Sequence, residues 1–151
     1  MRINATSIAN YISQISAQLA LRGYGTDVAQ LDRDDRFQAW NLTLFVIPQD
    51  HSVPGKRIKF VLDVSSLNNL GTRADITIIS AEFSGLLADE HKSQLNSAAL
   101  DALFEELSYR DGDYYVDDLS GEEYSNGFSI ERVVNALVKA AEVPTLAEDA
   151  R

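Results

Sequence analysis

The chain has 151 residues, about the length of one ordinary domain. Its hydrophobic share of 45% and charged share of 24% are those of a globular protein, and they exclude a collagen-like, coiled-coil or wholly disordered chain. The sequence has no cysteine, which excludes disulfides, thiolate metal sites and cysteine catalysis. The formal net charge of −10 argues against direct binding of nucleic acid.

Signals for export or membrane insertion are not apparent in the sequence. Residues 1–14 contain no apolar run of about 7–15 residues, so they do not resemble a secretory signal. The longest apolar stretch, residues 42–47, is far shorter than the ~20 residues that a membrane-spanning helix needs. We therefore expect a cytoplasmic protein that does not contact a membrane.

Apolar residues with helical spacing near the N-terminus predict a first helix over residues 5–22. Gly23 and Gly25 follow, and a glycine suits the left-handed conformation that ends many helices. The apolar set is Ile8, Ile12, Ile15 and Leu19.

Three strands are expected after this helix. Residues 26–36 are polar and predict a connector with at most a short strand over 28–31. Residues 37–47 are rich in aromatic and β-branched residues, and Phe45 and Ile47 lie on the face opposite the main apolar set, which predicts cover on both sides. The main apolar set is Trp40, Leu42, Leu44 and Val46.

The second and third expected strands cover residues 56–64 and 73–83. The first of these alternates cleanly, with Arg57 and Lys59 on its solvent face. We interpret the basic strip of Lys56, Arg57 and Lys59 as the guard of an edge strand in preference to a phosphate contact. In the strand over residues 73–83, the apolar residues change from one face to the other along the strand, which indicates a β-bulge or burial on both faces. Connections of about eight residues are too short for helical crossovers, so we expect an antiparallel meander.

The second half of the chain predicts two helices. Asn96 is interpreted as the cap of a helix that starts at Ser97, and Ser129 as the cap of a helix that Pro144 ends. For residues 114–119 the sequence leaves two alternatives open, a short fourth strand at the edge of the sheet or a part of the acidic loop. The buried stripe of the first of these helices is expected to be Leu100, Leu103, Phe104 and Leu107.

The expected fold class is therefore α+β. It comprises an N-terminal helix, a three-stranded antiparallel meander with a short fourth strand as an addition, and two C-terminal helices packed on the sheet. Residues 1–143 are expected to form a single domain, and residues 144–151 a flexible C-terminal tail.

Negative charge is concentrated in the second half of the chain. Residues 1–81 hold eight basic and seven acidic residues, whereas residues 82–151 hold five basic and sixteen acidic ones. Residues 111–123 alone hold six carboxylates and no base. One interpretation is a solvated loop that keeps the protein soluble. The other is a partner-binding surface of residues 111–124, the acidic segment, made by Asp111, Asp113, Tyr114, Tyr115, Asp117, Asp118, Glu122, Glu123 and Tyr124.

Metal and catalytic motifs are poorly matched. An EF-hand loop that starts at Asp111 would place Tyr115 and Val116 where an oxygen ligand and a glycine belong. His51 and His91 have no motif partner, so we predict no metal and no cofactor. Carboxylates in or beside strands leave acid–base catalysis open, and these are Asp63, Asp75 and Glu82.

These observations favour a non-catalytic protein-binding domain, such as an inhibitor, an immunity protein or an adaptor. The order of elements is similar to that of type III secretion chaperones, a resemblance that implies a chaperone-like binding role and spans most of the chain without a diagnostic residue. The expected partner is a basic protein surface, for example that of a nucleic-acid-binding protein, and a homodimer is also considered. The alternatives are a small enzyme that uses sheet-edge carboxylates and a structural subunit of a larger assembly.

Overall fold

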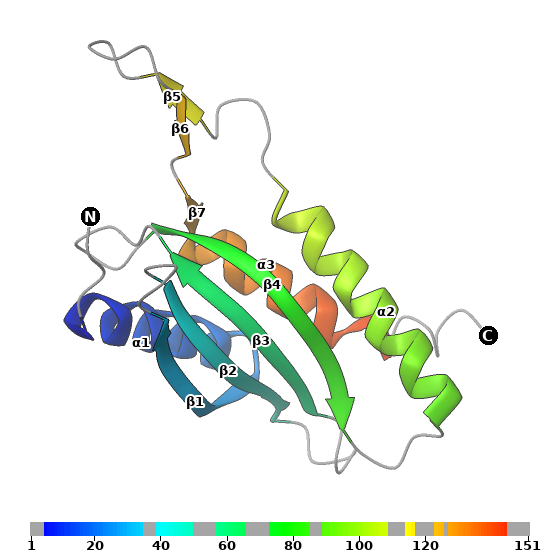
Figure 1. Cartoon of the computed structure of the whole chain (residues 1–151). Helices are drawn as coiled ribbons and strands as arrows, with labels where there is room; N and C mark the ends of the chain where they lie inside the picture. The colour runs from blue at the N-terminus through cyan, green and yellow to red at the C-terminus, as the bar shows by residue number, and fades with distance from the viewer. Residues whose placement is uncertain are drawn as a thin grey trace.

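A computed structural model describes residues 5–34, 39–49, 57–65, 73–84, 89–108, 114–116, 123–125 and 127–144 (Figure 1). In chain order, the elements are α1 (Ala5–Leu21), β1 (Tyr24–Asp34), β2 (Ala39–Pro48), β3 (Arg57–Ser65), β4 (Arg73–Ser84), α2 (Asp89–Glu106), β5 (Tyr114–Val116), β6 (Glu123–Ser125), β7 (Phe128–Ser129) and α3 (Ile130–Ala141). The α+β class is therefore confirmed.

The main sheet has five antiparallel strands in the order β1-β2-β3-β4-β7. The expected three-stranded meander corresponds to β2, β3 and β4, so the expected strand number was too low. The short strands β5 and β6 pair only with each other and form a second, two-stranded sheet. One face of the main sheet and the inner sides of all three helices contribute to a single hydrophobic core.

The first helix ends as the sequence predicts. α1 spans Ala5–Leu21, and its apolar stripe is buried in the core. Gly23 has a φ of +87°, the left-handed conformation that a glycine adopts without steric cost. The chain therefore reverses at once and returns as β1, which contacts α1.

The expected connector at residues 26–36 is instead most of β1, an eleven-residue edge strand. None of the β1 side chains whose burial is described is fully buried, and most of them are exposed, so the sequence of this edge strand need not be apolar. Its register with β2 shifts between Val28 and Gln30, and Val28 is 39% exposed. Polar composition therefore concealed a strand that pairs with β2 from Tyr24 to Asp34, except at Ala29, which the register shift leaves without a partner.

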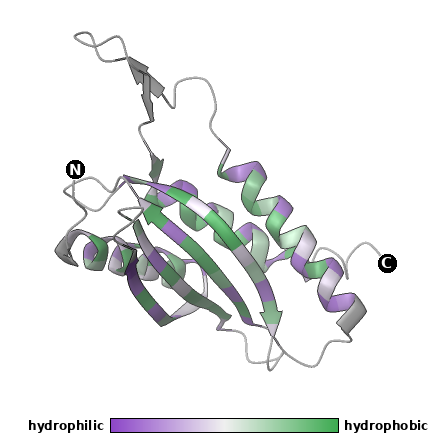
Figure 2. Cartoon of the chain, viewed as in Figure 1, coloured by the Kyte–Doolittle hydropathy of each residue, from purple (hydrophilic) through white to green (hydrophobic). Residues whose placement is uncertain are grey.

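β2 and β3 show the expected alternation, which Figure 2 displays as hydrophobic and hydrophilic residues in turn along the strands. The expectation that β2 is covered on both faces was wrong, because Ile47 is 36% exposed and Phe45 is only half-buried. The guard interpretation of Arg57 and Lys59 was also wrong, because β3 lies between β2 and β4 and is not an edge.

The phase change in β4 comes from a bulge. Opposite Val61 and Leu62, the register jumps from Ser80 to Ile78 and leaves Ile79 unpaired. Ile79 is 50% exposed, as expected for a residue that the bulge turns out of the core face. Of the two interpretations that the sequence left open, the bulge is therefore confirmed.

The second helix begins eight residues before the predicted start. α2 spans Asp89–Glu106, so Asn96 lies inside the helix and is not its cap. The Oδ1 of Asn96 instead accepts a hydrogen bond of 2.8 Å from the backbone N–H of Phe83 in β4. The helical pattern misplaced Phe104 as well, since it is 55% exposed, while Leu103 is fully buried.

The third helix is capped as predicted. The Oγ of Ser129 accepts a hydrogen bond of 3.2 Å from the backbone N–H of Arg132. Phe128 and Val133, on either side of the cap, are both buried, as a hydrophobic staple requires. α3 packs against α1 and α2 and carries seven buried residues, so it occupies the centre of the helical layer.

Candidate functional site

The structure describes only part of the acidic segment, and of that part only the backbone. Tyr114, Tyr115, Glu123 and Tyr124 lie in the strands β5 and β6. The remaining predicted partner-binding residues lie outside the described residues, and they are Asp111, Asp113, Asp117, Asp118 and Glu122.

β5 and β6 form an antiparallel hairpin that pairs Tyr115 with Tyr124 and Val116 with Glu123. The expected fourth strand over 114–119 therefore exists as Tyr114–Val116, but its partner is β6 and not the main sheet. Figure 1 shows the hairpin standing away from the five-stranded sheet, beyond β7. Six residues join the two strands, and three of them are carboxylates.

The C-terminal root of this hairpin, residues 127–129, is fixed on the main sheet. The Arg73 guanidinium donates a hydrogen bond of 3.0 Å to the carbonyl of Gly127. Gly127 has a φ of +72°, and a Cβ there would lie 2.9 Å from the carbonyl carbon of Ala74. Phe128 is 1% exposed. Only glycine fits this close approach of two backbones, so the point at which the chain enters the sheet is tightly defined.

The N-terminal root, residues 106–108 at the end of α2, is held by a second arginine. Arg132 donates a hydrogen bond of 2.8 Å from Nε to the Glu106 carbonyl, and another from its guanidinium to the Ser108 carbonyl. The guanidinium also lies 5.0 Å from the centre of the Phe128 ring. Arg132 therefore connects the end of α2 to the start of α3, and both roots of the acidic segment are anchored by arginines.

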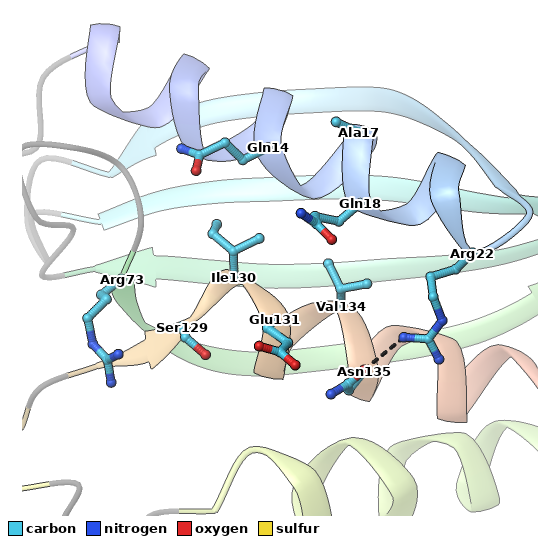
Figure 3. A pocket seen from close by; sticks show the side chains of 10 residues that line it. All are labelled: Gln14, Ala17, Gln18, Arg22, Arg73, Ser129, Ile130, Glu131, Val134 and Asn135. Atoms are coloured by element: carbon cyan, nitrogen blue, oxygen red, sulfur yellow. Dashed lines mark hydrogen bonds between the residues drawn. The ribbon is translucent and has the colours of Figure 1, made fainter.

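A groove of about 630 Å³ runs between α1 and α3 (Figure 3). One of its ends is bridged by Arg22, which donates a hydrogen bond of 2.8 Å to the Oδ1 of Asn135. Its other end lies at Arg73 and Ser129, beside the C-terminal root of the hairpin. The groove is lined by Gln14, Ala17, Gln18, Arg22, Arg73, Ser129, Ile130, Glu131, Val134 and Asn135.

The wall that α1 contributes is uncharged. The helix contains no Asp, Glu, Lys or Arg over its 17 residues, although the chain as a whole has a net charge of −10. Gln14 and Gln18 face the opposite wall, and Ile130 and Val134 point from α3 toward α1 (Figure 3). The groove therefore places aliphatic side chains of α3 opposite amide side chains of α1.

The carboxylates considered for catalysis lie on the sheet face that is not part of the core. Asp63 accepts a hydrogen bond of 2.9 Å from the side-chain amide of Asn41. Glu82 lies 3.3 Å from Lys59 in an ion pair, and Asp75 faces Ser65 in the register of β3 and β4. None of the three lines the groove between α1 and α3. The structure thus places them in the polar pairing of the sheet.

Metal ligands do not gather in the described part of the chain. Within it, no group of three or more His, Cys, Asp or Glu side chains is placed to hold an ion. His91 is exposed within α2, whereas the sequence placed it before the helix, and His51 lies outside the described residues. No helix among the described residues is both long and apolar enough to cross a membrane.

Sequence reasoning missed the groove and both anchoring arginines. The lining residues come from α1, β4, β7 and α3, whose contact is a result of the tertiary fold, and no short motif joins them. The one signal in the sequence is the uncharged first helix in an acidic chain. Comparison with known proteins found no matching family model, no matching curated protein and no matching solved structure.

Proposed function

We propose that this chain is a non-catalytic protein-binding domain that docks on a basic partner surface through its acidic segment. Inhibitors, immunity proteins, adaptors and secretion chaperones act by this kind of docking. In the proposed complex, the carboxylates steer the encounter and set the orientation, and the tyrosines supply contact area. The basic surface would belong to a protein, for example the nucleic-acid groove of an enzyme.

One observation supports this proposal above the others: both roots of the acidic segment are anchored on the buried body of the protein. Arg132 binds the carbonyls of Glu106 and Ser108, and Arg73 binds that of Gly127. A loop that served only to raise solubility would not require a glycine in contact with the Ala74 backbone at its base. Because both roots are anchored, the segment loses less conformational entropy when it binds a partner, which favours recognition.

Charge reversal tests the proposal. The test variant carries Asp117→Lys, Asp118→Lys and Glu122→Lys. A matched control carries three reversals at exposed carboxylates elsewhere, Asp27→Lys, Asp32→Lys and Asp101→Lys, so that both variants have the same net charge. Tagged wild type, test variant and control are each used to capture proteins from the native host, and the captured proteins are identified by mass spectrometry.

The expected result is at least one basic protein that wild type and control retain and that the test variant loses. Affinity for that protein should also fall as salt rises from 50 to 200 mM, since the distance over which exposed charges attract one another shortens with salt and is about 10 Å at 0.1 M. Equal capture by all three forms would overturn the docking role of the acidic segment. Equal loss in the test variant and the control would reduce the effect to net charge.

A further inference from the structure

The outer edge of β4 is covered only at its two ends. β4 has twelve residues, but β7 pairs with only the first two of them. Toward the other end, Ala81 is buried, and the side chain of Asn96 in α2 accepts a hydrogen bond from the N–H of Phe83. Between these ends, residues 76–80 have no strand on their outer side within the described part of the chain. A stretch of strand edge therefore remains open.

Apolar side chains that are not buried border this open edge. On β4, Ile76 and Ile78 are half-buried, and the bulge leaves Ile79 half exposed. On α2, Leu100 is half-buried and Phe104 is more than half exposed. We call these five residues the edge strip. Exposed apolar side chains beside an unpaired strand edge are typical of protein interaction sites.

The geometry of α2 places Phe104 beside the open edge. Asn96, Leu100 and Phe104 are spaced by four residues, so they lie on one side of the helix, and the contact of Asn96 marks it as the side that faces β4. Figure 1 shows α2 running back along β4 in the opposite direction. Phe104 lies about 12 Å beyond Asn96 along the helix, which corresponds to about three or four residues of strand and is the level of Ile79.

We propose that the edge strip binds a short extended segment of another protein, which adds to the main sheet as a strand in line with β7. The open edge offers main-chain N–H and C=O groups, and β7 shows that a strand pairs with β4 on this side. Apolar side chains of the segment pack on Phe104 and Ile79. The bulge at Ile79 limits the pairing to about four residues beyond the end of β7.

The charge beside Phe104 favours a basic residue in the bound segment. Asp101 lies three residues before Phe104 and is therefore its neighbour on the surface of α2. This carboxylate is exposed and forms no ion pair with any residue that the structure describes. Lys92 is the one lysine or arginine in the sequence of α2, and it lies more than two turns away. We therefore expect a lysine or arginine next to the apolar residues of the segment.

The test uses the full ¹⁵N-labelled chain and three blocked synthetic peptides of seven residues. In each peptide the five central residues alternate valine and threonine. The first peptide has lysine at both ends, the second has glutamate at both ends, and the third is the lysine peptide with its five central nitrogens methylated. Amide chemical shifts are followed during titration, and dissociation constants are fitted.

We expect saturable shifts from the lysine peptide at residues 76–80 and at Leu100 and Phe104. The glutamate peptide should bind more weakly, because its carboxylates are repelled by Asp101. The methylated peptide should not bind, because it cannot donate the main-chain hydrogen bonds that strand addition requires.

Four results would each overturn the proposal. Equal or tighter binding of the glutamate peptide would exclude a basic segment, and equal binding of the methylated peptide would exclude strand addition. Shifts confined to β1, the opposite edge of the sheet, would assign the peptide to another site. Shifts at residues 76–80 that appear when the chain is concentrated without peptide would mean that a second copy occupies the edge.

Ile79→Lys and Ile47→Lys provide a matched pair of variants. Both isoleucines are exposed strand residues, and each substitution adds one positive charge. Ile79 belongs to the edge strip, whereas Ile47 lies on β2, two strands away. Ile79→Lys should weaken binding of the lysine peptide by about fivefold or more, and Ile47→Lys should leave its dissociation constant unchanged. Equal behaviour of the two variants would contradict the edge strip as the site.

Phe104→Ala tests the aromatic contact. The substitution should weaken binding of the lysine peptide by about fivefold or more, as expected for an aromatic side chain that carries part of an interface. Urea denaturation of the same sample confirms that the variant is folded. A folded Phe104→Ala protein that binds the peptide as tightly as the wild type would remove α2 from the site.

The variant with Asp117, Asp118 and Glu122 changed to lysine separates this proposal from the proposed function. It should keep the shifts at the edge strip, because none of the three residues belongs to the strip. If it loses partner capture and keeps these shifts, both proposals stand. If it loses these shifts, the lysine peptide binds the acidic segment and the edge-strip proposal is wrong. If the wild type shows no such shifts while partner capture depends on the segment, only the edge-strip proposal fails.

Discussion

Tyr11 is a buried polar residue whose hydroxyl has no hydrogen-bond partner among the residues that the structure describes. The side chain is fully buried in the core. Its hydroxyl is one of two buried side-chain polar atoms without a partner among the described residues, the other being the Nε1 of Trp40. Burial without a partner costs about 1–3 kcal/mol of folding free energy. Burial also raises the pKa of Tyr11 above its ordinary value, because the phenolate would lose its hydration.

Tyr11→Phe should therefore stabilise the protein. The substitution removes the unpaired hydroxyl and keeps the ring, so we expect the free energy of unfolding at pH 7 to rise by about 1–2 kcal/mol. The measurement is urea denaturation of both forms. A Tyr11→Phe protein that is less stable than wild type would indicate a polar partner for this hydroxyl in solution.

The same residue predicts a difference at high pH. The pKa of Tyr11 is higher in the folded than in the unfolded state. The contribution of this pKa difference to the free energy of unfolding is therefore complete below pH ~10 and is lost as pH rises further. Wild type should lose about 1.4 kcal/mol per pH unit there beyond the loss seen in Tyr11→Phe. The pKa of Tyr24 is also raised, by burial and by the neighbouring Glu142 carboxylate. The pH dependence of stability should therefore be measured for Tyr24→Phe as well and compared with that of Tyr11→Phe. Identical pH profiles for wild type and Tyr11→Phe would refute this account.

At the scale of elements, the junction of β4, β7 and α3 determines where the hairpin begins and ends. Ala74 pairs with Phe128 and Arg73 with Ser129, so a two-residue strand places the cap of α3 directly on the sheet edge. The preceding residue, Gly127, approaches the Ala74 backbone more closely than any side chain allows. The stability of this junction therefore depends on one glycine.

Gly127→Ala should be much more destabilising than Gly23→Ala. Both glycines have positive φ, with values of +72° and +87°, so both alanines pay the conformational cost of about 1–2 kcal/mol. At Gly23 a Cβ meets nothing within 4 Å, whereas at Gly127 it meets the Ala74 backbone at 2.9 Å. We expect the Gly127→Ala cost to exceed that of Gly23→Ala by about 2 kcal/mol or more, measured by urea denaturation. Equal costs would mean that the two backbones separate easily.

Elements also differ in how well the sequence predicts them. An element is predicted well when the interaction that determines it is between residues close in the sequence, and poorly when the partner lies on another element. The cap at Ser129 was predicted because its partner, the N–H of Arg132, is three residues away. Asn96 was misread as a cap because its true partner is the N–H of Phe83 on another element. β1 was missed because an edge strand can be polar, and only its register with β2 identifies it.

On the scale of the whole molecule, the net charge of −10 opposes folding through self-repulsion. Within the described residues, ion pairs such as Lys59–Glu82 at 3.3 Å and Lys139–Glu106 at 2.7 Å offset part of it. Both pairs are partly exposed and each contributes little. The candidate site also shows what a sequence can and cannot predict. The concentration of negative charge is visible in the sequence, whereas the groove forms only where four elements meet and could not be predicted.

Raising sodium chloride from 10 to 200 mM should therefore raise the melting temperature of the wild type, because salt screens repulsion between exposed carboxylates. The variant with Asp117, Asp118 and Glu122 changed to lysine should show a smaller rise, since it has less charge to screen. Differential scanning calorimetry at fixed pH measures both. A melting temperature that falls with salt in the wild type would mean that attractive pairs outweigh the repulsion.

The way in which the hairpin joins the main body has a consequence for how this protein changes over time. On either side of the hairpin, two arginines hold the chain by the backbone carbonyls of Glu106, Ser108 and Gly127, which every residue type possesses. Positions 106 and 108 can therefore change in evolution without loss of these hydrogen bonds. Position 127 cannot, because a Cβ there would meet the Ala74 backbone at 2.9 Å.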